Sequence, residues 1–290
     1  MDRRITHYLG MGVDHSDIGS RRSNRLLAYP FVTEDSDVTR QMYFRPFIGF
    51  IVVLIAVSCS KKQEIAPQGQ TASNSLSIEE EIAFKDCPPE GLGGGNARLN
   101  RFKNRDHEPA HYEQTTIEHL IALRPQHIVQ AGKHDRNAWA ADATAEAAEY
   151  EKKGVSVEAY LLGAKQSGIE SCNCKREDLR DWHVWIGPHK PASSDEAKSM
   201  RGEGMVVEPT PRWQERKGWR LRQLTSLARQ GAKVRVSGWL LWDQEHPEEL
   251  PEHKGDKATR GTLWEIHPIT KIEVYTGGRW VEFTNGEIVL

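Results

Sequence analysis

The change from a helical to an alternating hydrophobic pattern at Gly154 is the feature that most constrains the fold of this chain. Alternation of apolar and polar residues is typical of half-buried strands. It recurs in five segments: 155–163, 181–187, 204–209, 232–243 and 261–275. Between the third and fourth of these, Leu221, Leu224 and Leu227 form the apolar stripe of an amphipathic helix. Two short segments, RWVEF and EIVL, predict a final hairpin, and Pro268 is expected to mark a bulge or an edge.

The element order strand, strand, strand, helix, strand, strand is that of the OB-fold, a five-stranded Greek-key barrel. Long loops after the first and fourth strands agree with this architecture. VRVSGWLLWD resembles the strand pattern that opens many OB barrels, because a glycine after the Val pair lets the strand bend. We therefore expect a mostly β domain with helices, an OB-fold-like five-stranded Greek-key barrel over 154–290. A helical or irregular segment over 81–153 is expected to precede it, with helices in TTIEHLIAL and DRNAWAADATAEAAEYEKK.

An apolar run that ends on a cysteine precedes this part of the chain. FIGFIVVLIAV is shorter than the about 20 residues that a membrane-spanning helix needs, and it matches the apolar core of a secretory signal. Arg45 supplies the positive charge before the run, and Ala56-Val57-Ser58 leads to Cys59. Residues 42–59 resemble the signal peptide and lipobox of a bacterial lipoprotein, with Ala56 where such boxes often have Leu. The resemblance implies that Cys59 carries lipid and anchors the protein in the cell envelope.

The leader divides the beginning of the chain into three regions. Residues 1–41 are expected to be a non-native extension, because they lack a sustained apolar period and Met42 opens a signal of ordinary proportions. Residues 42–58 are then the signal peptide, and the polar residues 59–80 are a flexible tether. Ser60 stands where an Asp would favour inner-membrane retention, so we favour the outer membrane.

Composition and cysteine content limit the partners and the covalent links. A formal net charge of -2 gives no strong attraction to nucleic acid. Apart from the membrane reached through the lipid, an envelope protein or a glycan is therefore the favoured partner. If Cys59 carries lipid, one disulfide from Cys87 to either Cys172 or Cys174 is expected. The triple glycine at 93–95 is interpreted as a loop, because the P-loop lysine and Ser/Thr spacing is absent.

Polar side chains alternate along two strands of the expected barrel. Asp181 and His183 share one strand face, and Glu265 and His267 share another. Carboxylate and imidazole groups suit zinc or another divalent metal, and a three-ligand site leaves a position for water. These four residues are therefore candidate metal ligands. A solvated polar face stays open as the alternative, because the spacing matches neither HExxH nor paired CxxC motifs.

Aromatic and basic residues suggest a second kind of site. Trp185, Trp239 and Trp242 are expected to be exposed, because they alternate with core positions or lie beyond them. Exposed aromatic rings beside cations are how OB-folds stack single strands or sugars. We assign ligand binding to Trp185, Trp239, Arg235 and Arg260 on this basis.

Three functions follow from these candidate sites. The favoured one is non-enzymatic binding of an unidentified ligand in the cell envelope. The second is a metal-dependent hydrolase that uses Asp181, His183, Glu265 and His267. The third is a nuclease-like phosphodiesterase, because staphylococcal-type nucleases carry Asp, Glu and Arg on an OB barrel. The sequence leaves enzymatic activity open, and it does not name the cofactor beyond zinc or another divalent metal.

Overall fold

A computed structural model describes residues 82–133 and 135–284. The expected extension, signal peptide, lipidated Cys59 and tether lie outside the described residues, as does the segment EIVL of the final hairpin. Within the described residues, no helix has the length and apolar character needed to cross a bilayer.

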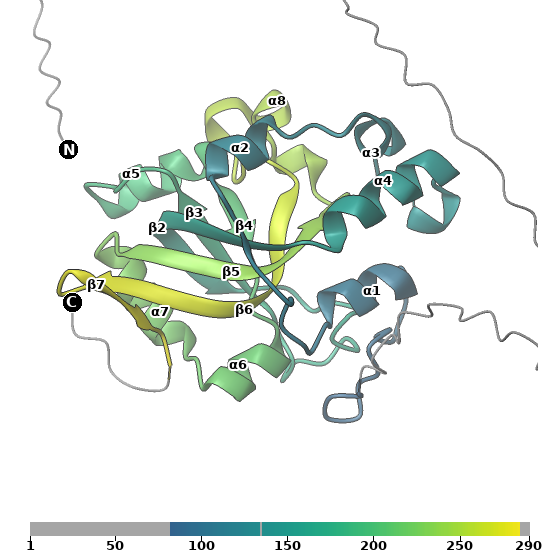
Figure 1. Cartoon of the computed structure of the whole chain (residues 1–290), viewed down its shortest axis with the longest axis horizontal. Helices are drawn as coiled ribbons and strands as arrows, with labels where there is room; N and C mark the ends of the chain where they lie inside the picture. The colour runs from purple at the N-terminus through teal and green to yellow at the C-terminus, as the bar shows by residue number, and fades with distance from the viewer. Residues whose placement is uncertain (1–81, 134, 285–290) are drawn as a thin grey trace, which may run out of the picture. The chain divides into compact units, whose positions relative to one another are not determined.

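Five strands form a closed barrel (Figure 1). They are β2 (Gly154–Gln166), β3 (Trp182–Gly187), β4 (Met205–Val207), β5 (Lys233–Trp242) and β6 (Trp264–Thr276). The circuit runs β2-β3-β4-β6-β5 and returns to β2, with β4 and β6 parallel and the other pairs antiparallel. Helices α6 (Pro211–Lys217) and α7 (Leu221–Arg229) connect β4 to β5. This order, with its helix between the third and fourth barrel strands, confirms the OB-fold-like architecture.

One long strand closes the barrel. The first half of β2 pairs with β5, from Gly154 against Trp239 to Tyr160 against Lys233. Its second half pairs with β3, and the register shifts between Leu161 and Gly163 where the strand changes partner. A single strand with two partners leaves no free edge between the ends of the sheet, which is how barrels remove exposed edges.

The core is formed by the inward face of every barrel strand, as the alternation predicted. Leu224 and Leu227 of α7 also lie in this core, and Trp242 packs edge-on against Trp264 at 4.9 Å between ring centroids. The inward side chains of the three predicted strands are Trp182, Val184, Ile186, Val234, Val236, Trp264 and Ile266.

Pro268 lies in an irregular part of β6 that is not an edge. The register of β5 against β6 shifts on both sides of Gly238. A Cβ atom on Gly238 would lie 2.2 Å from the carbonyl oxygen of Pro268, so only glycine permits this approach. The bulge that was one of the two expectations for Pro268 is therefore present. On its far side, β6 also pairs with β7 (Arg279–Glu282), which supplies the first half of the predicted hairpin.

The segment before Gly154 packs on the barrel within the same compact unit. Strand β1 was not predicted, and it extends the sheet by pairing parallel to the start of β2. The helix expected from Asp135 is a 3₁₀ turn followed by α4. The elements are α1 (Ala97–Lys103), β1 (Glu113–Thr115), α2 (Ile117–Ala122), α3 (Gln126–Ala131), η1 (Arg136–Ala138) and α4 (Ala141–Glu151).

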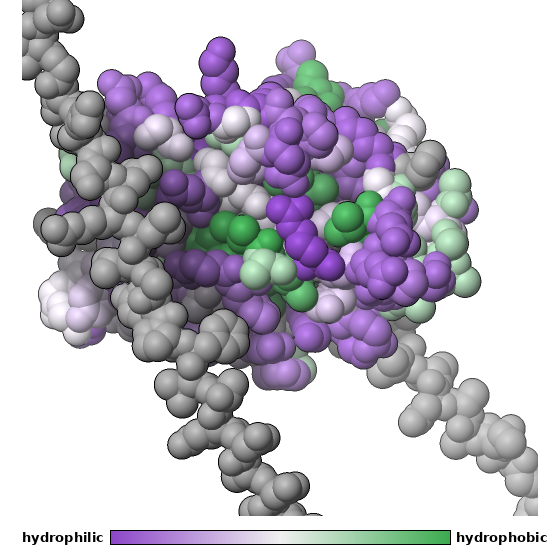
Figure 2. All heavy atoms as spheres, turned by 90° about the horizontal axis from the view of Figure 1, so that it is seen from above, coloured by the Kyte–Doolittle hydropathy of each residue, from purple (hydrophilic) through white to green (hydrophobic). Residues whose placement is uncertain are grey.

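The remaining short elements lie in the connections between barrel strands. These elements are α5 (Ser194–Ser199) and η2 (Met200–Glu203) before β4, and η3 (Pro247–Glu249), α8 (Pro251–Lys254) and η4 (Gly255–Lys257) before β6. Figure 1 shows α8 beside α2 at one end of the barrel, whereas α6 and α7 lie at the other end. On the face in Figure 2, hydrophilic side chains predominate and hydrophobic ones form only small patches.

A buried ion pair fixes the first segment to the barrel. Arg136 donates two hydrogen bonds of 2.7 and 2.6 Å to the carboxylate of Glu151, and both side chains are almost fully buried. Arg136 also donates to the carbonyl oxygen of Trp242 at the end of β5. Because all these groups are withdrawn from water, each depends on the others for its hydrogen bonds.

We predict that Glu151→Ala destabilises the fold strongly. The change leaves the guanidinium of Arg136 buried without its carboxylate, which typically costs about 3–5 kcal/mol. Urea denaturation followed by tryptophan fluorescence measures the effect. Glu149→Ala on the same helix removes an exposed ion pair with Lys152 and serves as the control, with a midpoint close to that of the unchanged protein. Equal midpoints for the two variants would contradict the role assigned to Arg136 and Glu151.

Candidate functional site

The predicted metal residues converge on the outer face of one barrel wall. His183 lies on β3, and Glu265 and His267 lie on β6, all on the side opposite the core. Asp181 precedes β3 directly. The short strand β4 pairs with both β3 and β6, so it brings these two strands together.

Glu208 completes the cluster and was missed by the sequence analysis. It follows β4 directly, and its backbone N–H donates to the carbonyl oxygen of Ile266. It lies two positions after Val206, so the alternation of GMVVEP already placed it on the outer face. The sequence does not show which strands pair with so short a strand, so it could not place Glu208 near the histidines.

His267 lies at the centre of the cluster. Its side chain is fully buried, with Nε2 3.7 Å from Oδ2 of Asp181 and Nδ1 3.4 and 3.5 Å from carboxylate oxygens of Glu208 and Glu265. Within the described residues, neither ring nitrogen has a hydrogen-bond partner. The other carboxylate oxygen of Glu208 lies 3.0 Å from Nε2 of His183. Glu208 therefore connects the two histidines.

The pKa values of two carboxyl groups in this cluster are shifted in opposite directions. Burial raises the pKa of Asp181 to about 7, with Glu170 adding to the effect and His267 opposing it. Burial also acts to raise the pKa of Glu208, but His183 and His267 outweigh it and lower that pKa to about 2. Burial acts to lower the pKa of His183, yet Glu208 raises it to about 9. Strongly shifted groups that lie together are typical of functional sites.

A network around Arg260 adjoins the cluster. Arg260 donates to Asp243 at 2.7 Å, to Glu265 at 2.8 Å and to Glu249 at 3.0 Å, and its side chain is only 1% exposed. His246 lies with Nδ1 2.6 Å from Asp243. Arg260 was predicted to bind ligand, and the structure places its guanidinium in the interior, where three carboxylates surround it.

Trp185 is also buried, against the expectation of an open aromatic face. It is 5% exposed and packs with Leu162 and Val206 in a small apolar cluster outside the barrel. The guanidinium of Arg201 lies 3.8 Å from the centre of its ring. The segment before β4 thus covers the ring, which sequence alternation alone did not reveal.

Trp239 and Arg235 are likewise engaged within the fold. The indole N–H of Trp239 donates to the carbonyl oxygen of His107, and the guanidinium of Arg105 lies 4.5 Å from its ring centre. Arg235 forms ion pairs with Glu158 and Glu273. Trp242 points into the barrel core. The structure thus does not bring the predicted ligand-binding residues together on one open surface.

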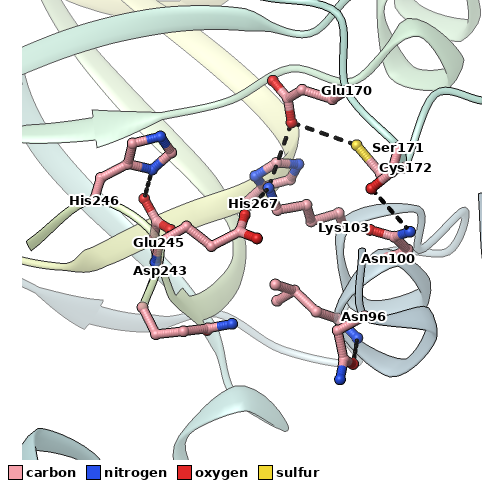
Figure 3. Close-up of polar contacts among 12 residues, drawn as sticks. Asn96, Asn100, Lys103, Glu170, Ser171, Cys172, Asp243, Glu245, His246 and His267 are labelled. Carbon is pink, nitrogen blue, oxygen red and sulfur yellow. Dashed lines mark hydrogen bonds and ion pairs between the residues drawn. The ribbon is translucent and has the colours of Figure 1, made fainter. Parts of the chain in front are cut away.

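Two segments cover the cluster from outside the barrel. Lys103 at the end of α1 has Nζ 3.4 Å from Glu170, which belongs to the loop between β2 and β3. In the same loop, Sγ of Cys172 lies 3.5 Å from Glu170 and 3.8 Å from Asp181. Figure 3 shows Lys103 and Cys172 both joined to Glu170, in front of His267. This loop is one of the two that flank the usual binding face of OB-folds.

A pocket of about 280 Å³ opens above this cover. The pocket is lined by Lys103, Glu170 and Cys172, which also form the cover over the cluster. The pocket is also lined by the triple-glycine loop, Asn100, Ser171, Lys175 and Glu245. The pocket therefore lies next to the buried cluster and is separated from it by Lys103, Glu170 and Cys172.

A disulfide connects the two sides of this pocket. Cys87 bonds to Cys174, one of the two pairings that the sequence left open, and Cys172 is a buried free thiol. Cys87 precedes the triple-glycine loop and α1, and Cys174 lies beside Cys172. The crosslink thus holds the two covering segments against each other.

Among residues 82–133 and 135–284, three overlapping groups have the donor set of a metal site, because the ligand atoms of each group lie within 4.8 Å of one another. The most buried group is Asp181, Glu208 and His267; the others are Glu170 with His183 and Glu208, and Glu170 with Cys172 and Asp181. Imidazole and carboxylate donors suit Zn²⁺ or a similar transition metal. The ring nitrogens of His267 and Oδ1 of Asp181, all buried without hydrogen-bond partners within the described residues, fit such an ion.

We predict that His246 makes stability depend on pH. The hydrogen bond with Asp243 outweighs burial and raises the pKa of His246 to about 9, above its unfolded value, while Arg260 opposes and Glu265 supports the shift. The stabilisation is therefore complete below about pH 6.5 and is lost as pH rises through 9. Allowing for partial exposure of the ring, the loss is about 1–2 kcal/mol.

Urea midpoints at pH 6 and pH 9.5 for the unchanged protein and for His246→Gln measure this loss. The variant is expected to lose less stability between the two pH values. His253→Gln, in the exposed α8 of the same loop, is the control and should follow the unchanged protein. Parallel pH profiles for His246→Gln and the unchanged protein would refute the assignment.

Comparison with known proteins returned one structural likeness. No family model matches the chain, and no curated protein matches it. Among solved structures, the crystal structure of yeast Stn1 and Ten1 is similar at a TM-score of 0.30 with 11% identity. The match covers 58% of this chain and 65% of that one, so this chain spans less than two thirds of the neighbour's length. The assignment of the barrel rests on its own strand order.

Proposed function

We propose that the cluster around His267 is a divalent-metal centre and that the protein is a metal-dependent hydrolase. The observation that carries this proposal is the position of the fully buried His267 among three carboxylates, with neither ring nitrogen in a hydrogen bond within the described residues. Asp181, Glu208 and His267 are the proposed ligands, and zinc fits their donor atoms. The pocket that adjoins Glu170 and Cys172 supports access of a substrate.

The residues of this chain each have a place in such a reaction. A divalent metal, when bound, supplies Lewis acidity and a nucleophile near neutral pH. His183 contacts Glu208 from the side of Glu170 and is positioned to transfer a proton to or from a substrate group. Arg260 holds Glu265 and Asp243 in place, and so fixes the wall behind His267. The cover formed by Lys103 and Glu170 limits entry of water.

The alternative of an aromatic binding face receives less support. A stacking platform needs open rings, whereas Trp185 and Trp242 are buried and Trp239 is covered by Arg105. The hydrolase is therefore the better account of this face of the barrel.

We predict about one equivalent of metal in the purified protein. Inductively coupled plasma mass spectrometry after dialysis against zinc and then buffer measures it. His267→Gln and Glu208→Gln are expected to lose the metal, because each removes a proposed ligand. His246→Gln is the matched control, a histidine in the neighbouring Arg260 network that is expected to keep the metal. Absence of bound metal in the unchanged protein, tested also with manganese, would reject the proposal.

We further propose that the protein is lipid-anchored in the cell envelope, in the outer membrane, where its partner is an envelope protein or glycan. The lipobox-like segment ending at Cys59 supports the anchor, and the Cys87–Cys174 disulfide suits an oxidising compartment.

Cys59→Ser is predicted to abolish both labelling by radioactive palmitate and sedimentation with membranes, because no thiol is left to receive the diacylglycerol. Cys172→Ser, which changes a thiol that is buried in the fold, is the control and is expected to retain both. Membrane association that persists in Cys59→Ser would exclude this anchor.

A further inference from the structure

We propose that the pocket beside the cluster binds a phosphoryl group, which makes the substrate of the hydrolase a phosphate ester. The proposal rests on the proposed function and deepens it by naming the class of substrate. It starts from the lining of the pocket, in which the glycines at 93–95 face Lys103 and Lys175.

The triple-glycine loop supplies hydrogen-bond donors. Gly93, Gly94 and Gly95 all have positive φ, at 84, 107 and 81°, which side chains rarely allow. In the part of the chain that the structure describes, their N–H groups donate to no carbonyl oxygen or side chain. Backbone N–H groups that have no acceptor within the protein are available to an anion in the pocket, as backbone N–H groups are in other anion-binding loops.

Close packing places this loop against the rest of the pocket. A Cβ atom on Gly95 would lie 2.3 Å from Oγ of Ser171, and one on Gly93 would lie 2.8 Å from Cδ of Lys175. The side chain of Asn100 donates to the carbonyl oxygen of Glu90 and lies 3.4 Å from Oγ of Ser171, which fixes the two segments. The loop therefore packs closely against Ser171 and Lys175. Gly93 and Gly95 are required because a side chain would clash there and because their φ values are positive.

The two lysines of the pocket have different roles. Lys103 is buried and forms ion pairs with Glu170 and Glu245, so its charge is largely compensated. Lys175 has no ion pair within the described residues. Among the described residues that line the pocket, its ammonium group is the cation without a carboxylate partner. Lysine acts as a point charge toward phosphate, and it supplements the backbone donors of the glycine loop.

The position of the pocket links this anion site to the cluster. Glu170 and Cys172, which line the pocket, also belong to candidate metal groups with Asp181 and with His183 and Glu208. Figure 3 shows Ser171 and Cys172 beside Asn100 on one side, and His267 behind Lys103 and Glu170. A phosphoryl group in the pocket would thus lie at the edge of the proposed metal centre. Hydrolysis there would break the ester P–O bond, with water supplying hydroxyl to phosphorus and a proton to the leaving alcohol.

Inorganic phosphate is the probe, and its binding is measured by isothermal titration calorimetry at low ionic strength. Lys175→Gln is expected to weaken binding by at least fivefold, and Lys175→Arg to retain it. Lys198→Gln, which removes an exposed ammonium group on α5, is the control and is expected to bind as the unchanged protein does. Equal affinity of Lys175→Gln and the unchanged protein, or no binding at all, would overturn the proposal.

A second measurement uses the unchanged protein, so its result does not depend on whether a variant folds. In ¹H–¹⁵N spectra, the amide signals of Gly93, Gly94 and Gly95 are expected to shift downfield as phosphate is added. Gly277 and Gly278, which also have positive φ in the turn between β6 and β7, are the matched control and should not move. Shifts confined to residues outside the pocket would reject this site. Co-sedimentation with vesicles that contain phosphatidic acid distinguishes a lipid source of the phosphoryl group from a soluble one.

The outcomes separate the two proposals. If phosphate binding depends on Lys175 but no metal binds to the unchanged protein, the hydrolase is rejected and the anion site stands alone. If metal binds through His267 and phosphate does not bind, the metal centre stands and a phosphate ester is excluded as its substrate.

Discussion

The pairing of β4 with both β3 and β6 is the interaction on which the candidate site depends. Only three residues form this strand, yet it connects the strand that carries His183 to the strand that carries His267. It also places Glu208 between the two histidines. The parallel pairing of β4 and β6 follows from the closed order of the barrel. The fold that encloses the core therefore also assembles the polar cluster on its outer face.

A cluster of this kind is not explained by stability. Withdrawing charges from water costs several kcal/mol per ion, and the mutual attraction of buried ions often does no more than offset this cost. The pair Arg136–Glu151 shows the structural solution, in which hydrogen bonds satisfy both partners. The groups around His267 are arranged differently: carboxylates surround the ring at 3.4–3.7 Å, and within the described residues neither ring nitrogen has a hydrogen bond of good geometry. That contrast is why the cluster suits an ion, whereas the arginine pair suits a structural role.

The alternation of residues predicted the strands, their inward faces and the outward position of Asp181, His183, Glu265 and His267, whereas the pairing that brings these residues together was not predicted. Such features depend on local periodicity, which a single sequence contains. Which outward-facing residues become covered depends on contacts between segments that are distant along the chain. The periodicity of a single segment does not predict such contacts. Arg105 over Trp239 and Lys103 beside Glu170 are examples, with partners that are far away along the chain. For the same reason, Arg260 was assigned to ligand binding from the sequence, whereas it lies buried among three carboxylates.

The disulfide links the two segments that cover the cluster. The segment that starts at Cys87 contributes the glycine loop, Asn100 and Lys103 to the pocket, and the segment that ends near Cys174 contributes Glu170 and Cys172. Neither segment belongs to the barrel, and each is short, so neither can form an extensive core of its own. Closing a loop of 87 residues restricts the unfolded chain and favours the state in which both segments lie together. The pocket above the cluster therefore depends on the crosslink as well as on the barrel.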